Sequence, residues 1–331
     1  MIRKLFAAVA MTAIMAGASW AADVKPAVVY DLGGRNDKSF NESAYMGAEK
    51  FKADTGVAFQ DFEIQNDSQR EQALRKFAER GFSPVVAIGF SHAEAVKKVA
   101  AEFPNTHFAI IDMVVEAPNV ASIVFKEQEG SYLVGVLAAL ASKSGKVGFV
   151  GGMDIPLIRR FACGYVGGVK ATNKDAEVFQ NMTGTTGAAW TDPVKGGELA
   201  KSQFDRGADV VYHAAGGTGI GVLQAAADAG KLGIGVDSNQ NALHPGKVLT
   251  SMLKRVDVAT YNVFKAGQDG TFKAGVTVLG LAEGGVGWAL DDNNKALITP
   301  EMKAAVDKAE ADIKGGTVKV HDYMEDSACP Y

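Results

Sequence analysis

Three aspartates, Asp31, Asp112 and Asp237, each directly follow a short run of apolar residues. Such a run is typical of a buried strand, and the carboxyl ends of parallel strands meet at one edge of a sheet, where ligands bind. A lone aspartate at such a place usually forms a turn or caps a helix. Three carboxylates facing one crevice could instead accept hydrogen bonds from sugar hydroxyls or from donors on a base edge. We therefore predict that at least two of them bind a ligand.

Other predicted strand ends carry glycine or helix-capping residues. The six segments are Asp31-Leu-Gly-Gly34, Gly89-Phe-Ser91, Asp112-Met113, Gly151-Gly-Met153, Ala214-Ala-Gly-Gly217 and Asp237-Ser238. Glycine lets the backbone turn tightly and approach a ligand closely. Together these segments outline a candidate cleft.

Aromatic and polar residues adjoin this cleft, and each has a structural reading beside the functional one. Phe40-Asn41 stands at a predicted helix start, where it forms a hydrophobic staple and N-cap or offers an amide to a heterocycle. Trp190 and Phe161 either pack in the core or stack on a flat ligand. Lys254 follows a predicted strand, at an expected crossing between two domains, and is either solvated or part of the site.

The glycine-rich segment Gly216-Gly-Thr-Gly-Ile-Gly221 follows a strand and opens a helix. Its spacing lacks the third glycine of the dinucleotide fingerprint, and it lies in the second half of the chain. The amides at such a helix start can still donate to a ligand oxygen, so we expect contact with a neutral ligand. His213, just before this segment, either acts in chemistry or is packed in the core.

No known catalytic or metal-binding spacing occurs in the chain: GxSxG, HExxH, a Walker loop and CxxC are all missing. The five histidines have no ligand spacing. Cys163 and Cys329 could form a disulfide in an oxidising compartment. We expect no cofactor and no enzyme activity, and the pattern favours binding over turnover.

Residues 1–21 have the features of a secretory signal peptide. Arg3 and Lys4 precede an apolar run, and Ser19 and Ala21 supply the small residues before a cut after Ala21. The apolar run is shorter than the roughly 20 residues that span a bilayer. No cysteine adjoins the cut, so we expect an exported protein without a lipid anchor.

The charge of the chain argues against a nucleic-acid partner. Without Arg3 and Lys4, 32 basic residues face 38 acidic residues, which gives a formal charge of −6. A mildly acidic protein has no electrostatic footprint for nucleic acid or for an anionic membrane. The apolar content of 47% excludes a disordered chain.

Short apolar runs alternate with helical segments through two blocks, 24–125 and 146–250. Predicted strands are Val24–Asp31, Phe59–Ile64, Val85–Gly89, Phe108–Asp112, Ser122–Phe125, Lys146–Gly151, Ala176–Asn181, Asp209–Ala214 and Ile234–Asp237. Predicted helices are 41–55, 68–81, 91–104, 161–172, 192–207, 218–229, 256–267 and 299–315, and further strands lie near 276–280 and 286–290. This alternation predicts an α/β protein with two Rossmann-like domains, each with about five parallel strands covered on both faces.

Four helix starts carry capping signals. Ser68-Gln-Arg-Glu71 and Ser91-His-Ala-Glu94 match the capping box. Asp192-Pro193 and Thr299-Pro300 place proline directly after a capping residue.

The segment Asp31-Leu-Gly-Gly-Arg-Asn-Asp-Lys-Ser-Phe-Asn41 resembles the opening motif of the basic membrane protein family. These are substrate-binding proteins of ABC transporters and include purine nucleoside receptors. Further matching segments follow in the family's order and cover nearly the whole mature chain: Phe108–Asp112, Val124–Gly135, Lys146–Gly152, Phe161–Tyr165, Trp190–Gly196, Ala214–Gly219, Ile234–Asp237 and Thr250–Lys254.

The resemblance implies a type I periplasmic-binding fold with two lobes joined by three crossing strands. We expect an N-terminal lobe of residues 22–125 plus about 251–285, and a C-terminal lobe of 126–250 plus about 286–331. The implied ligand is a nucleoside, and the implied partners are the permease subunits of an importer in a Gram-negative periplasm. The transporter's ATPase lies elsewhere, so no ATP site is expected.

The resemblance also implies roles for single residues. Phe40 and Trp190 would stack on the base, and Asp31 and Asn41 would contact its edge. The ribose would be held by Asp112, Asp237, Lys254 and an amide near Gly216, with Phe161 also at the site. Tryptophan stands at 190 where many relatives carry phenylalanine, and the lipid-modified cysteine of the lipoprotein members is missing.

Three other functions stay open from the sequence. The chain could be a receptor for another flat or polyhydroxylated ligand, such as a flavin or a sugar. A different class of function is an enzyme, either an exported nucleoside hydrolase or an NAD(P)-dependent enzyme. A hydrolase should show a dense aspartate cluster for a metal near the N-terminus, and Asp31 and Asp37 alone do not form one.

Overall fold

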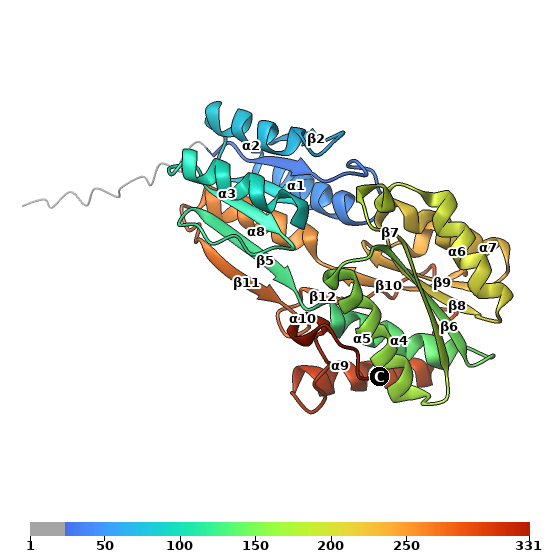
Figure 1. The fold of residues 1–331 in the computed structure, drawn as a ribbon. Coiled ribbons are helices and arrows are strands. Elements are labelled where there is room, and N and C mark those ends of the chain that lie inside the picture. The colour runs from blue at the N-terminus through green and yellow to red at the C-terminus, as the bar shows by residue number, and fades with distance from the viewer. Residues whose placement is uncertain (1–23) are drawn as a thin grey trace, which may run out of the picture.

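Two six-stranded sheets lie side by side in the computed structural model, which describes residues 24–331 (Figure 1). The expected signal peptide, residues 1–21, lies outside the described residues. The chain therefore has the predicted two-lobed α/β architecture, with one strand more in each sheet than expected.

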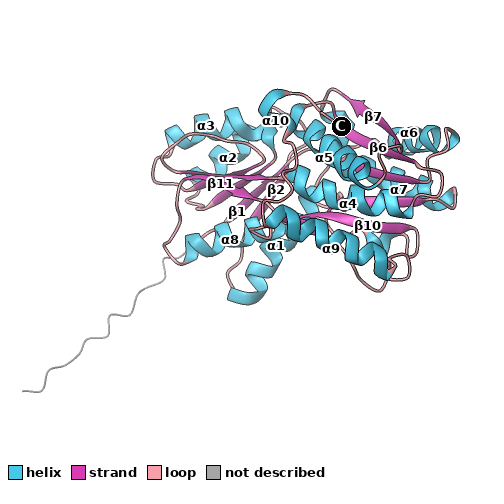
Figure 2. Ribbon diagram, turned by 90° about the horizontal axis from the view of Figure 1, so that it is seen from below, coloured by secondary structure: helices cyan, strands magenta, loops and turns pink. Residues whose placement is uncertain are grey.

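The first sheet is parallel throughout and has the strand order β11-β5-β4-β3-β1-β2. Its strands are β1 (Ala27–Tyr30), β2 (Gln60–Glu63), β3 (Val85–Ile88), β4 (Phe108–Ile111), β5 (Val120–Phe125) and β11 (Gly275–Leu279). The three central strands β1, β3 and β4 are buried at every residue. Helices cover both faces of the sheet (Figure 2), so every side chain of these strands is buried and their sequences are unbroken apolar runs. These helices are α1 (Phe40–Thr55), α2 (Gln69–Glu79), α3 (Ala93–Glu102) and α8 (Val256–Gln268).

The second sheet has the order β12-β10-β9-β8-β6-β7, and only its edge strand β12 is antiparallel among the described strands. Its strands are β6 (Lys146–Met153), β7 (Glu177–Gly184), β8 (Val210–Ala214), β9 (Leu232–Asp237), β10 (Val248–Lys254) and β12 (Val286–Trp288). The helices around it are α4 (Glu127–Ala141), α5 (Pro156–Thr172), α6 (Pro193–Asp205), α7 (Gly219–Asp228) and α9 (Pro300–Lys314), with the short α10 (Tyr323–Asp326) in the tail.

The chain crosses between the sheets three times. It passes from β5 to α4, from β10 to α8, and from β11 to β12. Backbone hydrogen bonds tie these crossings together, from Lys126 to Leu279 (3.0 Å) and from Arg255 to Gly285 (2.8 Å). Strand β10 of the second sheet extends to Lys254, and α8 begins at Val256.

Helix α4 is the longest element that sequence patterning missed. Eleven of its 15 residues are buried, because it packs against α5, α9 and the second sheet. A helix that is apolar all round has no polar face, so its sequence lacks the periodic pattern by which amphipathic helices are recognised.

Two of the four predicted helix caps are confirmed and two are wrong. Asp192 accepts a hydrogen bond from the Lys195 amide, and Thr299 accepts one from the Met302 amide. Ser68 already has helical backbone angles, and its hydroxyl bonds Asn66 instead. Ser91 lies within a 3₁₀ turn, Phe90–His92, so α3 begins two residues later at Ala93.

The two cysteines, Cys163 in α5 and Cys329 near the C-terminus, form a disulfide that spans 166 residues of sequence. The bond fastens the tail to α5, and Tyr331 packs on Gly167 of the same helix. From the sequence alone, the two cysteines could have been either paired or free.

The double variant C163A/C329A is expected to lose about 2–5 kcal/mol of unfolding free energy, because its unfolded chain regains the freedom of a long closed loop. Urea unfolding of both proteins without reductant measures the difference. A variant with the wild-type midpoint would show that the bridge adds nothing to stability.

Candidate functional site

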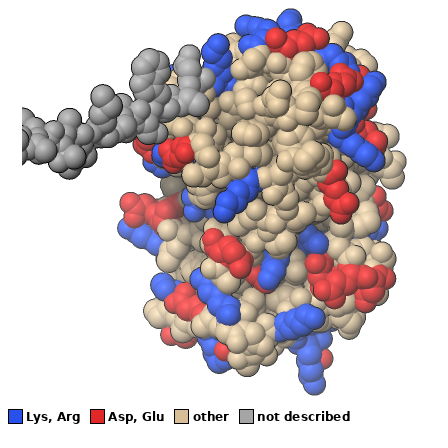
Figure 3. Space-filling model, turned by 90° about the vertical axis from the view of Figure 1, so that its left-hand side faces the viewer, with Lys and Arg blue, Asp and Glu red and all other residues tan. Residues whose placement is uncertain are grey.

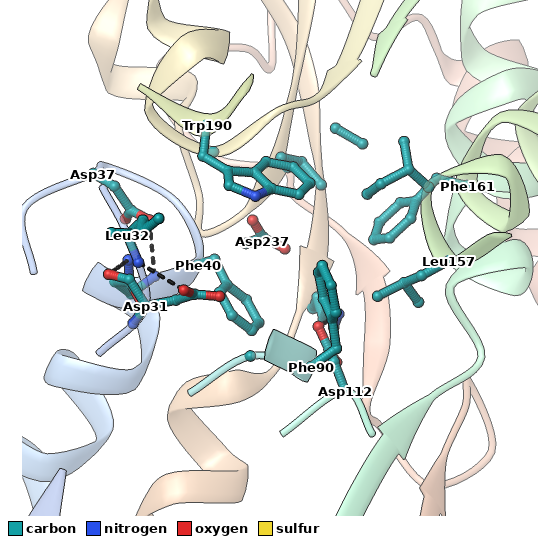
Figure 4. Close-up of a pocket in the computed structure, with 17 residues that line it drawn as sticks. Asp31, Leu32, Asp37, Phe40, Phe90, Asp112, Leu157, Phe161, Trp190 and Asp237 are labelled. Atoms are coloured by element: carbon teal, nitrogen blue, oxygen red, sulfur yellow. Dashed lines mark hydrogen bonds and ion pairs between the residues drawn. The ribbon is translucent and has the colours of Figure 1, made fainter. Parts of the chain in front are cut away.

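A pocket lies between the two lobes, at the carboxyl ends of the strands of both sheets, with about 580 Å³ of empty space including its opening to solvent. We call it the inner pocket (Figure 4). It is lined by all nine residues that the sequence proposed for ligand contact: Asp31, Phe40, Asn41, Asp112, Phe161, Trp190, Gly216, Asp237 and Lys254. The structure brings these side chains together from segments that are distant in sequence.

Aromatic rings form the walls of the inner pocket. The indole of Trp190 and the ring of Phe40 lie on opposite sides of the space, with Phe161 beside the indole (Figure 4). Gly152 makes room for Trp190, since a Cβ there would lie 2.1 Å from the indole. The arrangement is suited to holding a flat ring system between aromatic faces.

Several apolar lining residues were missed by the sequence analysis. They are Leu32, Phe90, Leu157, Ile158 and Val236. Phe90 lies two residues after the end of β3, within a strand-end segment that was recognised only for its glycine and serine. Leu157 and Ile158 lie in the first turn of α5, which begins at Pro156 rather than at the predicted Phe161.

Asp31 lies at one end of the pocket and is fixed on several sides. Its Oδ1 accepts from the Leu32 amide (2.7 Å) and lies 2.7 Å from Nη1 of Arg70. Asn41 is bonded to the Asp31 backbone, accepting from its amide (3.1 Å) and donating to its carbonyl (3.3 Å). Burial raises the pKa of Asp31, and Arg70 opposes that rise.

Asn41 is therefore not the cap of α1, contrary to the sequence interpretation. Asp37 has that role: its carboxylate accepts from the amides of Ser39 (2.9 Å), Asn41 (3.0 Å) and Glu42 (3.0 Å). Asp37 also lines the inner pocket. Burial raises its pKa to about 6, although these amides favour the charged form.

Asp112 and Asp237 share an unusual backbone conformation, with φ of 71° and 63° in the left-handed region. Non-glycine residues adopt it at a cost, which is tolerated mainly where the side chain has a task. Oδ2 of Asp237 accepts from the Ser39 hydroxyl of the other lobe (2.5 Å). Oδ1 of Asp112 is buried without a hydrogen-bond partner among the described residues. Burial raises the pKa of both carboxyls, that of Asp237 to about 6.

Lys254 is the buried cation of the site. Its ammonium lies 2.6 Å from Asp112 and 2.9 Å from Glu127, and the side chain is 2% exposed. The rings of Phe40, Phe125 and Phe161 surround it at 5.1–5.5 Å. Burial opposes the charge, but the nearby carboxylates outweigh it and raise the pKa of Lys254. The interpretation of a solvated lysine is thus wrong.

Glu127 was missed, although it starts α4 at a crossing between the lobes. It is fully buried and also pairs with Arg160 (2.9 Å), which in turn pairs with Asp322 of the tail (2.7 Å). An acidic residue just after a strand, in Lys126-Glu-Gln-Glu129, was the available signal. This chain of charges connects the inner pocket to the C-terminal segment.

The glycine-rich segment contributes backbone to the pocket. Gly216 has a φ of +55° and starts a 3₁₀ turn after β8 that borders the inner pocket. Gly219 serves packing instead, because a Cβ there would lie 2.0 Å from the His213 ring. His213 is buried and bonds Gln240 (2.9 Å), which fits the packed interpretation.

Several hydrogen bonds join the lobes directly across the cleft. Besides the Ser39–Asp237 bond, the Ser238 hydroxyl donates to the Ser39 carbonyl (2.9 Å), and the Gln240 amide donates to the Lys38 carbonyl (2.9 Å). The structure therefore has a closed cleft. We call these bonds the interlobe contacts.

The pKa shifts predict how pH changes the stability of the ligand-free protein. The folded pKa values of Asp37 and Asp237, about 6, lie above the ordinary value of 3.8, so the folded state binds more protons between those limits. The cost of burying each carboxylate is present above pH 6 and is relieved as the pH falls, by about 1–3 kcal/mol per group.

Denaturant unfolding of ligand-free protein at pH 7.5 and at pH 5 is the test. The wild type should gain stability on acidification relative to D237N, which lacks one of the two groups. Equal pH dependence in the two proteins would contradict the assignment for Asp237.

The outer face of the first lobe carries acidic and basic side chains interspersed with neutral ones (Figure 3). That face has no field of one sign of the kind that nucleic acid would require. Among residues 24–331, no helix is long and apolar enough to span a membrane. The same residues contain no group of three or more His, Cys, Asp or Glu side chains suited to a metal ion.

Comparisons with known proteins agree with this geometry. The model of the family described as ABC transporter substrate-binding protein PnrA-like matches residues 24–322. The chain is 35% identical over 321 residues to the ABC transporter nucleoside-binding protein BmpA of Lactococcus lactis subsp. cremoris, covering 90% of this chain and 89% of that protein. It is 33% identical over 289 residues to basic membrane protein A of Borreliella afzelii, covering 84% and 86% of the two chains.

A solved structure of an ABC transporter solute-binding protein from Aeropyrum pernix K1 superposes with a TM-score of 0.82 at 30% identity. The match covers 90% of this chain and 93% of that one. Family model, sequence relatives and fold agree over nearly the whole described chain. The chain therefore belongs to the family of PnrA-like ABC transporter substrate-binding proteins.

Proposed function

We propose that this protein is the periplasmic receptor of an ABC importer and binds a nucleoside, preferably a purine nucleoside, in the inner pocket. The observation that carries the proposal is an aromatic slot between Phe40 and Trp190 with hydrogen-bonding groups at both ends. Asp31 lies at one end, and Asp112 lies toward the other (Figure 4). A nucleoside has this division, with a flat base joined to a ribose rich in hydroxyls.

The proposed ribose end of the pocket has unused hydrogen-bonding capacity. Oδ1 of Asp112 is a buried acceptor without a partner among the described residues, and leaving such a group unpaired costs about 1–3 kcal/mol. A ribose hydroxyl would satisfy it, with Asp237 and Lys254 beside it. Backbone at Gly216 completes this end of the pocket.

The base end combines stacking with recognition of an edge. Phe40 and Trp190 supply apolar contact with the faces of a base, and Phe161 adds to the wall. Asp31 offers a carboxylate oxygen to an N–H donor of the base. Asn41 acts mainly through the Asp31 backbone, which its amide holds on both sides.

Transport requires that the ligand favour the closed form. A nucleoside touching Phe40 on one lobe and Trp190 on the other has more contacts when the lobes are together, and only such differential affinity shifts the open–closed equilibrium. The permease would then recognise the closed pair of lobes. Export by the signal peptide over residues 1–21, without a lipid anchor, would place the receptor free in the periplasm.

Calorimetry with a panel of nucleosides tests the proposal. The protein is unfolded to strip co-purified ligand and refolded under oxidising conditions, so that Cys163 and Cys329 pair again. We expect micromolar or tighter binding of at least one purine nucleoside at one site per chain, with no base or ribose released. Binding of riboflavin or a sugar but of no nucleoside would overturn the proposal, and released base would indicate a hydrolase.

A further inference from the structure

A buried arginine stands beside the base end of the inner pocket without lining it. Arg70, in the first turn of α2, is 5% exposed. It pairs with Asp31 (2.7 Å) and with Asp67 (2.8 Å). It lines a second hollow, which also borders Asp31 and Trp190 and which we call the outer hollow.

The two oxygens of Asp31 have different surroundings. Oδ1 is occupied by Arg70 and by the Leu32 amide. Oδ2 accepts no hydrogen bond from the described residues and lies against Gly89, where a Cβ would be only 2.5 Å away. The glycine therefore leaves room for Oδ2, which is the oxygen available to a ligand.

Burial has the largest effect on the pKa of Asp31 and raises it, and the carboxylate of Asp67 adds to the rise. Arg70 is the main group that lowers this pKa, and the Leu32 amide lowers it further. His92, packed nearby in the 3₁₀ turn after β3, stays neutral, because burial and the charge of Arg70 lower its pKa to about 3. The remaining neighbour on α1 is the uncharged amide of Asn41.

We propose that Arg70 keeps the Asp31 carboxylate ionised and directs its free oxygen to the ligand, so that the site selects bases with an N–H donor at this edge. This inference rests on the proposed function. The favoured ligands are 6-oxopurine nucleosides, such as inosine and guanosine, whose ring nitrogen N1 carries a hydrogen. Arg70 acts through Asp31 and is a positioning residue.

The physical basis is that an ionised carboxylate only accepts hydrogen bonds. A base with a bare N1 would place a second acceptor against it, and both groups would be buried unpaired. Sites built to bond a particular N–H or O–H reject ligands that lack it by large factors. A protonated Asp31 would instead donate to a bare N1, which would reverse the preference.

The experiment compares inosine with purine riboside, which has the same ribose but a bare N1 and no 6-oxo group. The ratio of their dissociation constants cancels effects of pH or mutation on the ribose carboxylates Asp112 and Asp237. For the wild type at pH 7.5 we expect inosine to bind about 100-fold more tightly. In R70M the ratio should fall to about tenfold or less, or should invert, as Asp31 takes up a proton.

Arg75→Met is the matched control, because Arg75 lies on the same helix and pairs with Glu71 and Glu102 away from the pocket. R75M should keep the wild-type ratio. R70K retains the charge and should keep most of the preference, which guards against misfolding of R70M. In the wild type, the ratio should fall as the pH is lowered and Asp31 takes up a proton.

The outcomes separate the two proposals. If the nucleosides bind but R70M and acidification both leave the ratio unchanged, the role of Arg70 is wrong and the proposed function stands. A wild type that binds the two nucleosides equally also overturns the selection. If neither nucleoside binds any variant, the proposed function fails and this inference fails with it.

Discussion

Replacing Lys254 with methionine is expected to lower the free energy of unfolding by about 3–5 kcal/mol and to abolish detectable ligand binding. The ammonium is the close cation of Asp112, whereas Glu127 also has Arg160. Methionine keeps most of the side-chain volume against Phe40, Phe125 and Phe161 but leaves Asp112 buried without a counter-charge. Urea unfolding at pH 7.5 measures the loss of stability, and calorimetry measures binding.

Two further variants separate charge from packing. K254M/D112N should recover more than half of the lost stability without recovering binding, because the unpaired carboxylate is gone. K265M removes an exposed lysine that pairs with Asp269 and should change stability by less than about 1 kcal/mol. Acidification should also reduce the difference in unfolding free energy between K254M and the wild type, because the unpaired Asp112 carboxylate becomes protonated. A K254M protein as stable as the wild type at pH 7.5 would show that the buried charges do not depend on Lys254.

The second large effect is expected for Asp237→Asn, which should weaken nucleoside binding by about 100-fold or more while leaving the protein folded. Asparagine tolerates the left-handed backbone of this position (φ 63°) and can still accept from the Ser39 hydroxyl. It cannot offer the charged acceptor to a ribose hydroxyl. Since burial raises the pKa of Asp237 to about 6, removing its charge should leave the ligand-free protein as stable as before or more stable.

Asp292→Asn is the control for loss of one acidic residue, because its side chain is 92% exposed. It should bind like the wild type. Thermal unfolding of the ligand-free proteins establishes that each variant is folded before its affinity is interpreted. Wild-type affinity in D237N would remove Asp237 from the binding site.

Most strands were predictable from sequence because buried parallel strands need unbroken apolar runs. The site followed from the same logic, since polar residues after such runs had to meet at one edge. Helix α4 was not predictable, because its apolar surface continues all round. The caps at Ser68 and Ser91 failed because neighbouring residues offered other local structures.

The charged residues that support the site were not found in this way. Glu127 and Arg70 come from helix starts, and their importance arises only when the fold places them against Lys254 and Asp31. The same holds for Phe90, whose ring reaches the pocket from a turn. Sequence patterning identifies residues that face a cleft but not the second layer of side chains that fixes their charge and orientation.

The interlobe contacts bear on how long a ligand stays bound. The Ser238 and Gln240 bonds hold Ser39 and Lys38 without using any group that we assign to the ligand. Opening of the lobes requires these bonds to break, so the residence time of a ligand that leaves in this way depends on the rate of lobe opening as well as on its own contacts. Two ligands of unequal affinity could then dissociate at similar rates. A permease that weakens the interlobe contacts would speed release of the ligand without touching it.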